Sequence, residues 1–287
     1  MGATSRPTSF WLAALRRRRA HQHDDLGLDE PISWNSDEER RAAAKFFNAA
    51  FRAEESGLRQ AHELADEVAE LDPDLAEVLR LYGAEEGWHR ELLEGLLGRI
   101  DGGIQPMGTV TGLFYRVYAR ARRMETIVLV NLMFETIGAT TYRMALRNVR
   151  HGAARRMLTV LTRDESFHVP LNVHFLRIVL ARNPEALPRL RRIYRLLFAS
   201  LVLLPLASRP KAKAFDGIQT LALARGYAEQ LARLFMHEPE LGLEPPRLLL
   251  ALLGLRRDEL ARKGAPITLA DNVDRAVNRE DVIVEAL

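Results

Sequence analysis

Apolar residues recur every three or four positions along most of this chain, which is the spacing of amphipathic α-helices. No run of alternating β-branched residues is bounded by turn dipeptides, so we predict an all-α fold. Helix boundaries are marked by Ser36 in SDEE, Asp72-Pro73, the break IDGGIQPMG at 100–108, His151-Gly152 and Asn183-Pro184. These signals predict four long helices between residues 36 and 183.

The remaining segments predict a different organisation on either side of this region. Residues 1–35 contain an apolar run followed by four arginines and predict a flexible basic arm, with room for one docking helix. Residues 184–262 predict two or three accessory helices packed on the bundle, and residues 263–287 an extended tail. Within the accessory region, 191–213 is apolar with basic flanks, which fits either a buried helix or a helix that contacts an anionic membrane surface.

Composition narrows the classes of function. The net charge of +3 is small for 287 residues and predicts no nucleic-acid partner. The absence of cysteine excludes disulfides, thiolate metal sites and iron–sulfur clusters, so nitrogen and oxygen atoms must hold any metal. The most apolar run, 196–207, is shorter than the ~18 residues of a membrane span. We therefore expect a cytoplasmic protein, with peripheral membrane contact left open.

Carboxylates occur inside the apolar stripe of each predicted long helix. In chain order, these stripes contain Glu54, then Glu86 with His89, then Glu135, then Glu165 with His168. A carboxylate buried without a partner is costly, so it must be ion-paired, neutralised or bound to metal. Few cationic side chains share these stripes, which favours a metal over ion pairing.

The spacing along the chain indicates that these residues form one site. Glu86 lies 32 positions after Glu54, and Glu165 lies 30 positions after Glu135, with a turn near the middle of each interval. At about 1.5 Å per helical residue, the Glu and the Glu-x-x-His of each hairpin meet at nearly the same depth. Two lone Glu residues and two Glu-x-x-His motifs on four helices are the ligand pattern of a dinuclear carboxylate site.

Together with the run FRAEES at 51–56, this pattern resembles the ferritin-like di-iron carboxylate superfamily. The oxygen-activating branch, with rubrerythrins and di-iron oxygenases, is more similar than ferritin itself. The resemblance covers roughly residues 37–182 and implies a ferritin-like four-helix bundle with additional C-terminal helices. It also implies one metal held by Glu54, Glu86 and His89, and a second held by Glu135, Glu165 and His168.

Residues beside the ligands receive roles from the same resemblance. It implies that Asp164 orients His89 from the other hairpin; a surface acid is the alternative interpretation. Tyr82 and Tyr142 share the stripes with the ligands and fit either core packing or hydrogen bonding beside the site. Three further acids are expected to be solvated: Glu55, Glu85 and Glu125.

The function implied is that of a non-haem di-iron oxidase or oxygenase. It would use O2 and an external electron donor to oxidise an apolar small molecule by hydroxylation, desaturation, deformylation or N-oxygenation. Two iron ions are the expected cofactor, with manganese–iron or two manganese ions as alternatives. The arylamine N-oxygenases are similar in length but carry an additional His where this chain has Leu161. A peroxidase or catalase-like protein and a metal-free helical interaction protein remain alternatives, and a homodimer is left open.

Overall fold

The computed structural model describes residues 6–20, 26–101, 103–106, 112, 121–207 and 215–266. Every regular element in these ranges is helical, which confirms the predicted all-α fold. The long helices are α1 (Thr8–Arg19), α2 (Asp37–Val68), α3 (Pro73–Asp101), α5 (Met124–Asn148), α6 (Gly152–Arg182), α7 (Leu187–Ala207) and α8 (Thr220–His237). The short ones are η1 (Pro184–Ala186), η3 (Pro239–Leu241), α9 (Arg247–Leu252) and α10 (Arg257–Lys263).

Local sequence explains where α2 and α3 begin. The Ser36 hydroxyl accepts a hydrogen bond from the backbone N–H of Glu39 at 3.1 Å and so caps α2. The Asp72 carboxylate does the same for α3, accepting from the Leu75 N–H at 3.0 Å. Pro73 takes the first helical position, where its missing N–H costs no intrahelical hydrogen bond. Both predicted helix starts are confirmed.

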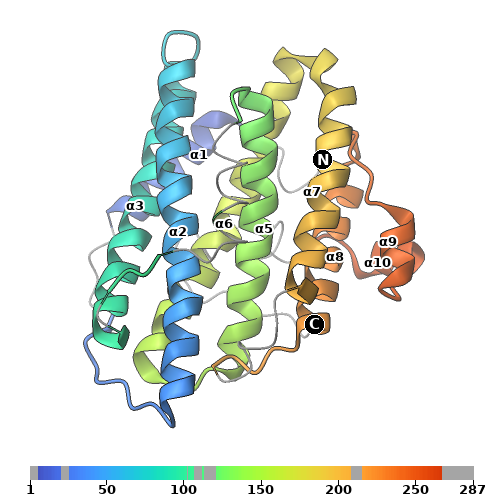
Figure 1. The fold of residues 1–287 in the computed structure, drawn as a ribbon. Helices are drawn as coiled ribbons and strands as arrows, with labels where there is room; N and C mark the ends of the chain where they lie inside the picture. Colours follow the sequence, from blue (N-terminus) through green and yellow to red (C-terminus); the bar gives the residue numbers. More distant parts are fainter. Residues whose placement is uncertain are drawn as a thin grey trace.

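Four of the long helices run side by side as two hairpins. Helix α2 packs along α3, and α5 packs along α6. The hairpins meet where α2 contacts α5 and where α3 contacts α6. Helices α7 and α8 pack on each other and against α5, while α9 and α10 lie beyond α8 (Figure 1).

The apolar interior consists of two clusters, one on each side of the middle of these four helices. One cluster contains Phe47, Phe51, Leu96 and Leu158. The other contains Leu64, Leu79, Met133 and Phe167 and continues into α1, α7 and α8. Helices α2, α3 and α6 pass from one cluster to the other near their predicted metal ligands, and α5 does so shortly after Glu135, between Ala139 and Tyr142. The fold therefore brings these polar residues to one level between two apolar cores.

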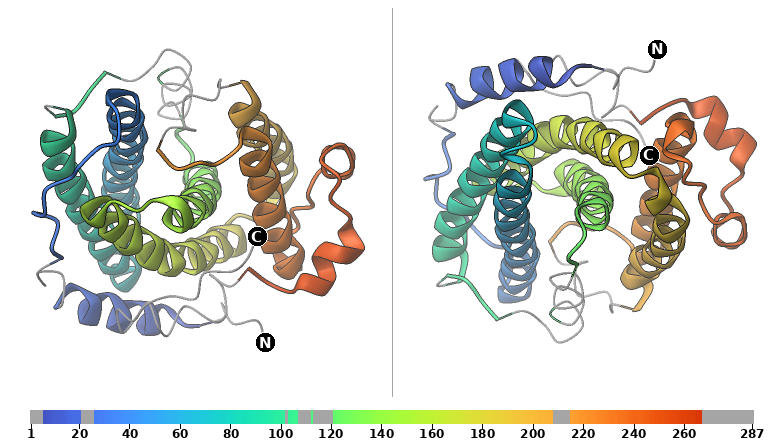
Figure 2. Two further views of the ribbon diagram at one scale, coloured as in Figure 1. Left: turned by 90° about the horizontal axis from the view of Figure 1, so that it is seen from below. Right: turned by 90° about the horizontal axis from the view of Figure 1, so that it is seen from above.

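The N-terminal segment differs from the prediction of a flexible arm over 1–35. Helix α1 packs across α3 and α6, on the side away from α2 and α5 (Figure 2). Trp11, Leu15 and Arg18 on its inner face are fully buried. These residues follow helical spacing. Arg18 therefore shares the apolar face of the helix and is buried together with it. Residues 8–19 thus form the docking helix for which the sequence left room, rather than part of a flexible arm.

The C-terminal third contains more helices than the two or three predicted. Helices α9 and α10 are only 6 and 7 residues long, too short to show helical periodicity in the sequence. Within 191–213, α7 buries one face and exposes Leu196, Leu203 and Leu206, while 208–213 lie outside the described residues. None of the helices that the structure describes has both the length and the apolar character needed to cross a membrane. The predicted tail is described only as far as residue 266.

Replacing Trp11 with alanine should lower the free energy of unfolding by about 3–5 kcal/mol, because a fully buried ring that packs on Phe167 is lost. Ser9→Ala changes an exposed position on the same helix and should shift it by less than about 0.5 kcal/mol. Urea denaturation of both variants measures the difference. Equal stabilities would restore the interpretation of α1 as a loosely attached arm.

Candidate metal centre

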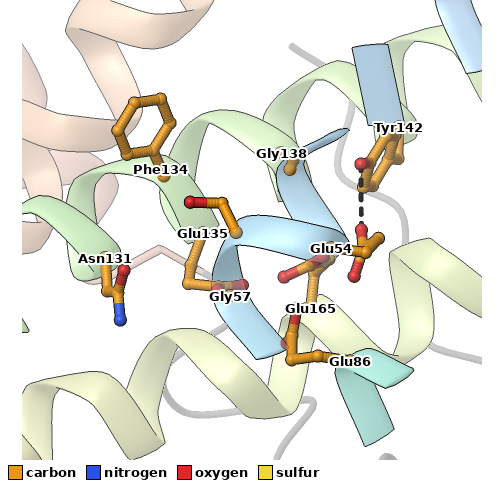
Figure 3. A pocket seen from close by; sticks show the side chains of 11 residues that line it. Glu54, Gly57, Glu86, Asn131, Phe134, Glu135, Gly138, Tyr142 and Glu165 are labelled. Atoms are coloured by element: carbon orange, nitrogen blue, oxygen red, sulfur yellow. Dashed lines mark hydrogen bonds between the residues drawn. The ribbon is translucent and has the colours of Figure 1, made fainter. Parts of the chain in front are cut away.

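The six predicted ligands converge at one level of the four central helices. We call this set the Glu/His layer: Glu54 of α2, Glu86 and His89 of α3, Glu135 of α5, and Glu165 and His168 of α6. All six are buried, with exposed fractions between 0 and 9%. Figure 3 shows the four glutamates of the layer pointing toward one another from different helices.

The layer contains two overlapping triads of ligand atoms. Glu54, Glu86 and His89 each offer one atom within 4.8 Å of the others, and so do Glu86, Glu135 and His168. Glu86 belongs to both triads and lies between the two histidines. The Nδ1 atom of His168 is 3.7 Å from the nearest oxygen of Glu165, which places this sixth residue beside the second triad. The arrangement matches two adjacent cation sites that share one carboxylate.

Each histidine is held from behind by a carboxylate of the opposite hairpin. The Nε2 atom of His89 lies 2.9 Å from Asp164 Oδ2, and the Nε2 atom of His168 lies 3.1 Å from Glu85 Oε2. In the neutral imidazole, an Nε2–H that donates to the carboxylate leaves the Nδ1 lone pair facing the layer. Both Nδ1 atoms do face glutamates, at 3.2 Å from Glu54 and 3.0 Å from Glu86. Nδ1 is therefore the atom available to a metal.

Glu85 and Arg18 are the functional candidates that the sequence analysis missed. Glu85 is 1% exposed, so the expectation that it would be solvated is wrong. It is paired with the fully buried guanidinium of Arg18, which also reaches Asp164. A sequence signal was present, because Glu85 precedes Glu86 as Asp164 precedes Glu165. The pattern acid-Glu-x-x-His thus occurs in both hairpins.

The other two acids expected to be solvated lie away from the layer. Glu125 is also buried, and it pairs with Arg189 of α7. That expectation is wrong as well, because the partner comes from an element outside the four-helix region. Glu55 is partly exposed and pairs with Arg52 on the outside of α2. Glu54 rather than Glu55 is the residue that faces the site.

The two tyrosines that share the stripes hold ligand carboxylates. Tyr82 is fully buried and donates a hydrogen bond from its hydroxyl to Glu135 at 2.6 Å. Tyr142 donates to Glu54 at 3.3 Å (Figure 3). Each lone Glu of the layer is therefore oriented by a phenol from another helix, which favours the hydrogen-bonding interpretation over core packing alone.

Burial and the close spacing of the carboxylates raise the pKa values of two glutamates of the layer, and a cation would stabilise their ionised forms. Burial, followed by the charges of Glu135 and Glu54, raises the pKa of Glu86 well above its ordinary value. Burial and the neighbouring Glu135 likewise raise the pKa of Glu165. Carboxyls this close cannot all ionise unless positive charge lies between them. Protons supply that charge when no metal is bound.

The carboxylates behind the histidines are ionised instead. Burial opposes the charge on Glu85, but Arg18 and His168 outweigh it and lower its pKa to about 2. Burial also opposes the charge on Asp164, but Arg18, Arg163 and His89 hold its pKa well below its usual range. These two groups are permanent acceptors for the imidazole N–H groups.

Three polar atoms of the layer are buried without a hydrogen-bond partner among the described residues. They are Glu86 Oε1, Glu165 Oε2 and His168 Nδ1. Glu86 Oε1 and His168 Nδ1 lie 3.0 Å apart but are not aligned as a hydrogen bond. Unpaired buried polar atoms are costly, and bound cations would satisfy all three.

Carboxylate oxygen and imidazole nitrogen form a donor set that suits iron or manganese. The residues present therefore fit a two-metal centre.

A cavity borders the layer between α2 and α5. Its wall includes the four glutamates, and its half-buried outer edge consists of Ala53, Phe134 and Gly138. The cavity has a volume of about 40 Å³, which is enough for about three water molecules. The inner space thus suits ions and molecules of the size of dioxygen, while a larger molecule would approach at the outer edge.

No family model, curated protein or solved structure matches this chain. The resemblance to the ferritin-like superfamily therefore stays a prediction. The support for a metal centre comes from the geometry of the Glu/His layer alone.

The metal-free protein should lose stability as the pH rises from 6.5 to 9. Burial alone would lower the pKa of His89, but Asp164 and Glu54 outweigh burial and raise it to about 9, from 6.5 in the unfolded chain. The resulting stabilisation is complete below pH 6.5 and disappears as the pH passes 9. It amounts to about 3 kcal/mol for this group.

Melting temperatures measured across this pH range test the effect. His89→Gln should flatten part of the profile, whereas the exposed His62→Gln should leave it unchanged. A flat profile for the unsubstituted metal-free chain would contradict this electrostatic account.

Gly57→Ala should weaken metal binding by about tenfold or more, because its Cβ would lie only 2.6 Å from Glu86 Oε2 and displace the shared carboxylate. Gly138→Ala is the matched control, since its Cβ meets Tyr142 and Glu165 at ordinary distances of 3.6 and 3.9 Å. Calorimetric titration of both variants with Mn²⁺ measures the affinities. Equal loss in both would show that Glu86 is not the shared ligand.

Proposed function

We propose that this chain is a di-metal oxidoreductase that binds two iron ions and uses O2 and an external reductant to oxidise an apolar small molecule. The observation that carries the proposal is the pair of buried Glu/His triads that share Glu86. Each of the four central helices contributes to this layer. Lone glutamates on α2 and α5, with Glu-x-x-His motifs on α3 and α6, support a ferritin-like arrangement of the bundle.

The charge of the site supports two divalent cations. Six carboxylates are buried here: the four glutamates of the layer, with Glu85 and Asp164 behind them. Among the residues that the structure describes, the guanidinium groups of Arg18 and Arg163 form ion pairs with this cluster. With neutral histidines and ionised carboxylates, four negative charges remain uncompensated. Two divalent ions would neutralise them, which is why we favour two ions over one.

The residues of the chain would hold and shield these ions. Glu54 with His89 would hold one and Glu135 with Glu165 and His168 the other, while Glu86 would contact both. Two ferrous ions, when bound, supply the two electrons that reduce dioxygen. Tyr82 fixes the carboxylate of Glu135 through its 2.6 Å hydrogen bond, and Tyr142 restrains Glu54. The apolar clusters on both sides of the layer exclude water from an oxidising centre.

The cavity supports a small apolar substrate. Ala53, Phe134 and Gly138 at its outer edge present carbon atoms next to the glutamates. Asn131 and Ser56 also line it and provide a limited number of polar contacts. The chain has no cysteine and hence no iron–sulfur cluster of its own, so the electrons would come from a separate donor.

Peripheral membrane contact through 191–213 belongs to the same proposal, because it would bring an apolar substrate to the protein. In its support, α7 exposes Leu196, Leu203 and Leu206, and Arg192 and Arg195 are also exposed on this helix. A basic flank beside exposed leucines fits an anionic lipid surface.

Metal analysis of protein produced with iron and manganese supplementation tests the proposal. We expect about two iron ions per chain. The Glu86→Ala, Glu165→Ala double variant should lose them, and Glu91→Gln, an exposed acid on α3, should keep both. Absence of metal from the unsubstituted chain would contradict the proposal.

The ferrous protein should then consume O2 only when reductant is supplied, as an oxygen electrode would record. Manganese in place of iron, with O2 released from hydrogen peroxide without reductant, would favour the catalase-like alternative instead.

A further inference from the structure

One buried cation in this part of the protein comes from outside the four central helices. Arg18 lies in the last turn of α1 and has an exposed fraction of 0%. Its Nε donates to Glu85 at 2.8 Å, and one terminal nitrogen donates to the other oxygen of Glu85 at 3.0 Å. A terminal nitrogen also lies 2.9 Å from Asp164 Oδ1. The planar guanidinium therefore joins the two acids that stand behind the histidines.

Two chains of contacts lead from Arg18 to the Glu/His layer. One runs through Glu85 to Nε2 of His168, and the other runs through Asp164 to Nε2 of His89. Arg163 pairs with Asp164 at 2.8 Å, on the outer side of the same carboxylate. The structure thus connects one guanidinium to the histidines of both triads.

The guanidinium fixes the direction of the two carboxylates. Each acid is fully buried and makes a hydrogen bond to an imidazole, so its plane decides where the imidazole points. Without Arg18, Arg163 would still pair with Asp164, but the guanidinium that ties Asp164 to Glu85 would be lost. The two negative groups of opposite hairpins would then repel each other and shift, and both histidines would lose the fixed acceptor that aims Nδ1 at the layer.

Contacts of α1 with α6 hold the Arg18 side chain in position. The ring of Trp11 meets Phe167 edge to face and lies near His174, at 5.4 and 5.9 Å between ring centroids. The Arg18 guanidinium lies over the face of Phe167 at 4.5 Å, a cation–π contact next to His168 in the chain. Phe167 of α6 therefore contacts both Trp11 and Arg18, at the two ends of the inner face of α1.

We propose that Arg18 is a positioning residue for both metal sites, and that docking of α1 and metal binding stabilise each other. The inference rests on the proposed two-metal function but assigns a new role to the N-terminal helix. Because coupling between two binding events is reciprocal, metal ions should hold α1 in place as strongly as α1 improves their affinity.

Metal titration of variants on α1 tests the first part. Arg18→Gln should weaken Mn²⁺ binding at both sites by about 10–100-fold, the usual loss for a group that orients metal ligands. Arg16→Gln is the matched control. Arg16 lies on the same helix as Arg18 but forms an exposed ion pair with Glu77 of α3, so this variant should leave both affinities unchanged. Arg18→Lys keeps the charge without the fork and should fall between the two.

Two further readouts separate positioning from a purely structural role. Millimolar guanidinium should restore Mn²⁺ affinity to Arg18→Ala, while equal NaCl should not. The visible spectrum of the Co²⁺-loaded protein, which reports the geometry of the ligands, should change in Arg18→Lys and not in Arg16→Gln. If Arg18→Gln is too unstable to purify, the spectrum and affinity of Arg18→Lys decide the question.

Limited trypsin digestion tests the coupling. Mn²⁺ should slow cleavage within Arg16–Arg19 of the unsubstituted chain by about tenfold or more, but should not change cleavage in α10. This inference would be overturned if Arg18→Lys and Arg16→Gln bound two ions with equal affinity and Mn²⁺ did not protect α1. The two-metal proposal would then remain intact. Failure of the unsubstituted chain to bind metal would instead remove the proposed function itself.

Discussion

The burial of six carboxylates between two apolar clusters is the constraint on which the rest of this structure depends. Four of them face one another from different helices, and proximity without water makes simultaneous ionisation costly. The raised pKa of Glu86, caused by burial and then by Glu135 and Glu54, expresses that cost in the metal-free chain. Helix packing alone would be better served by leucine at these positions. Their presence is therefore the main support for the proposed metal ions.

A second electrostatic constraint concerns the buried acids that accept hydrogen bonds from the two histidines. The imidazoles need permanent acceptors at Nε2, and these acceptors are themselves buried acids. Arg18 pairs with both Glu85 and Asp164 from behind. Its charge outweighs burial together with that of His168 beside Glu85 and those of Arg163 and His89 beside Asp164, and so lowers the pKa values of both acids. The site is therefore layered: cations would sit inside the glutamates, histidines around them, then acids, then a guanidinium. The outermost part belongs to α1, which is not one of the four central helices.

Much of this arrangement could be predicted from the sequence, because local periodicity places side chains on helix faces. The starts of α2 and α3 and the inward direction of Glu54, Glu86, Glu135 and Glu165 follow from spacing and capping residues. The contribution of α1 could not be predicted in the same way. Periodicity marks Arg18 as a member of an apolar face but does not say what that face covers. Glu85 was misplaced for the same reason, since its burial depends on a partner 67 residues away.

Anomalous X-ray diffraction from crystals of the iron-loaded protein would show where metal ions bind. We expect two iron peaks within the Glu/His layer, one beside Nδ1 of His89 and one beside Nδ1 of His168, with the Glu86 carboxylate between them. Peaks only at surface carboxylates, or a single peak that leaves one triad without metal, would show that the layer is not a two-metal site.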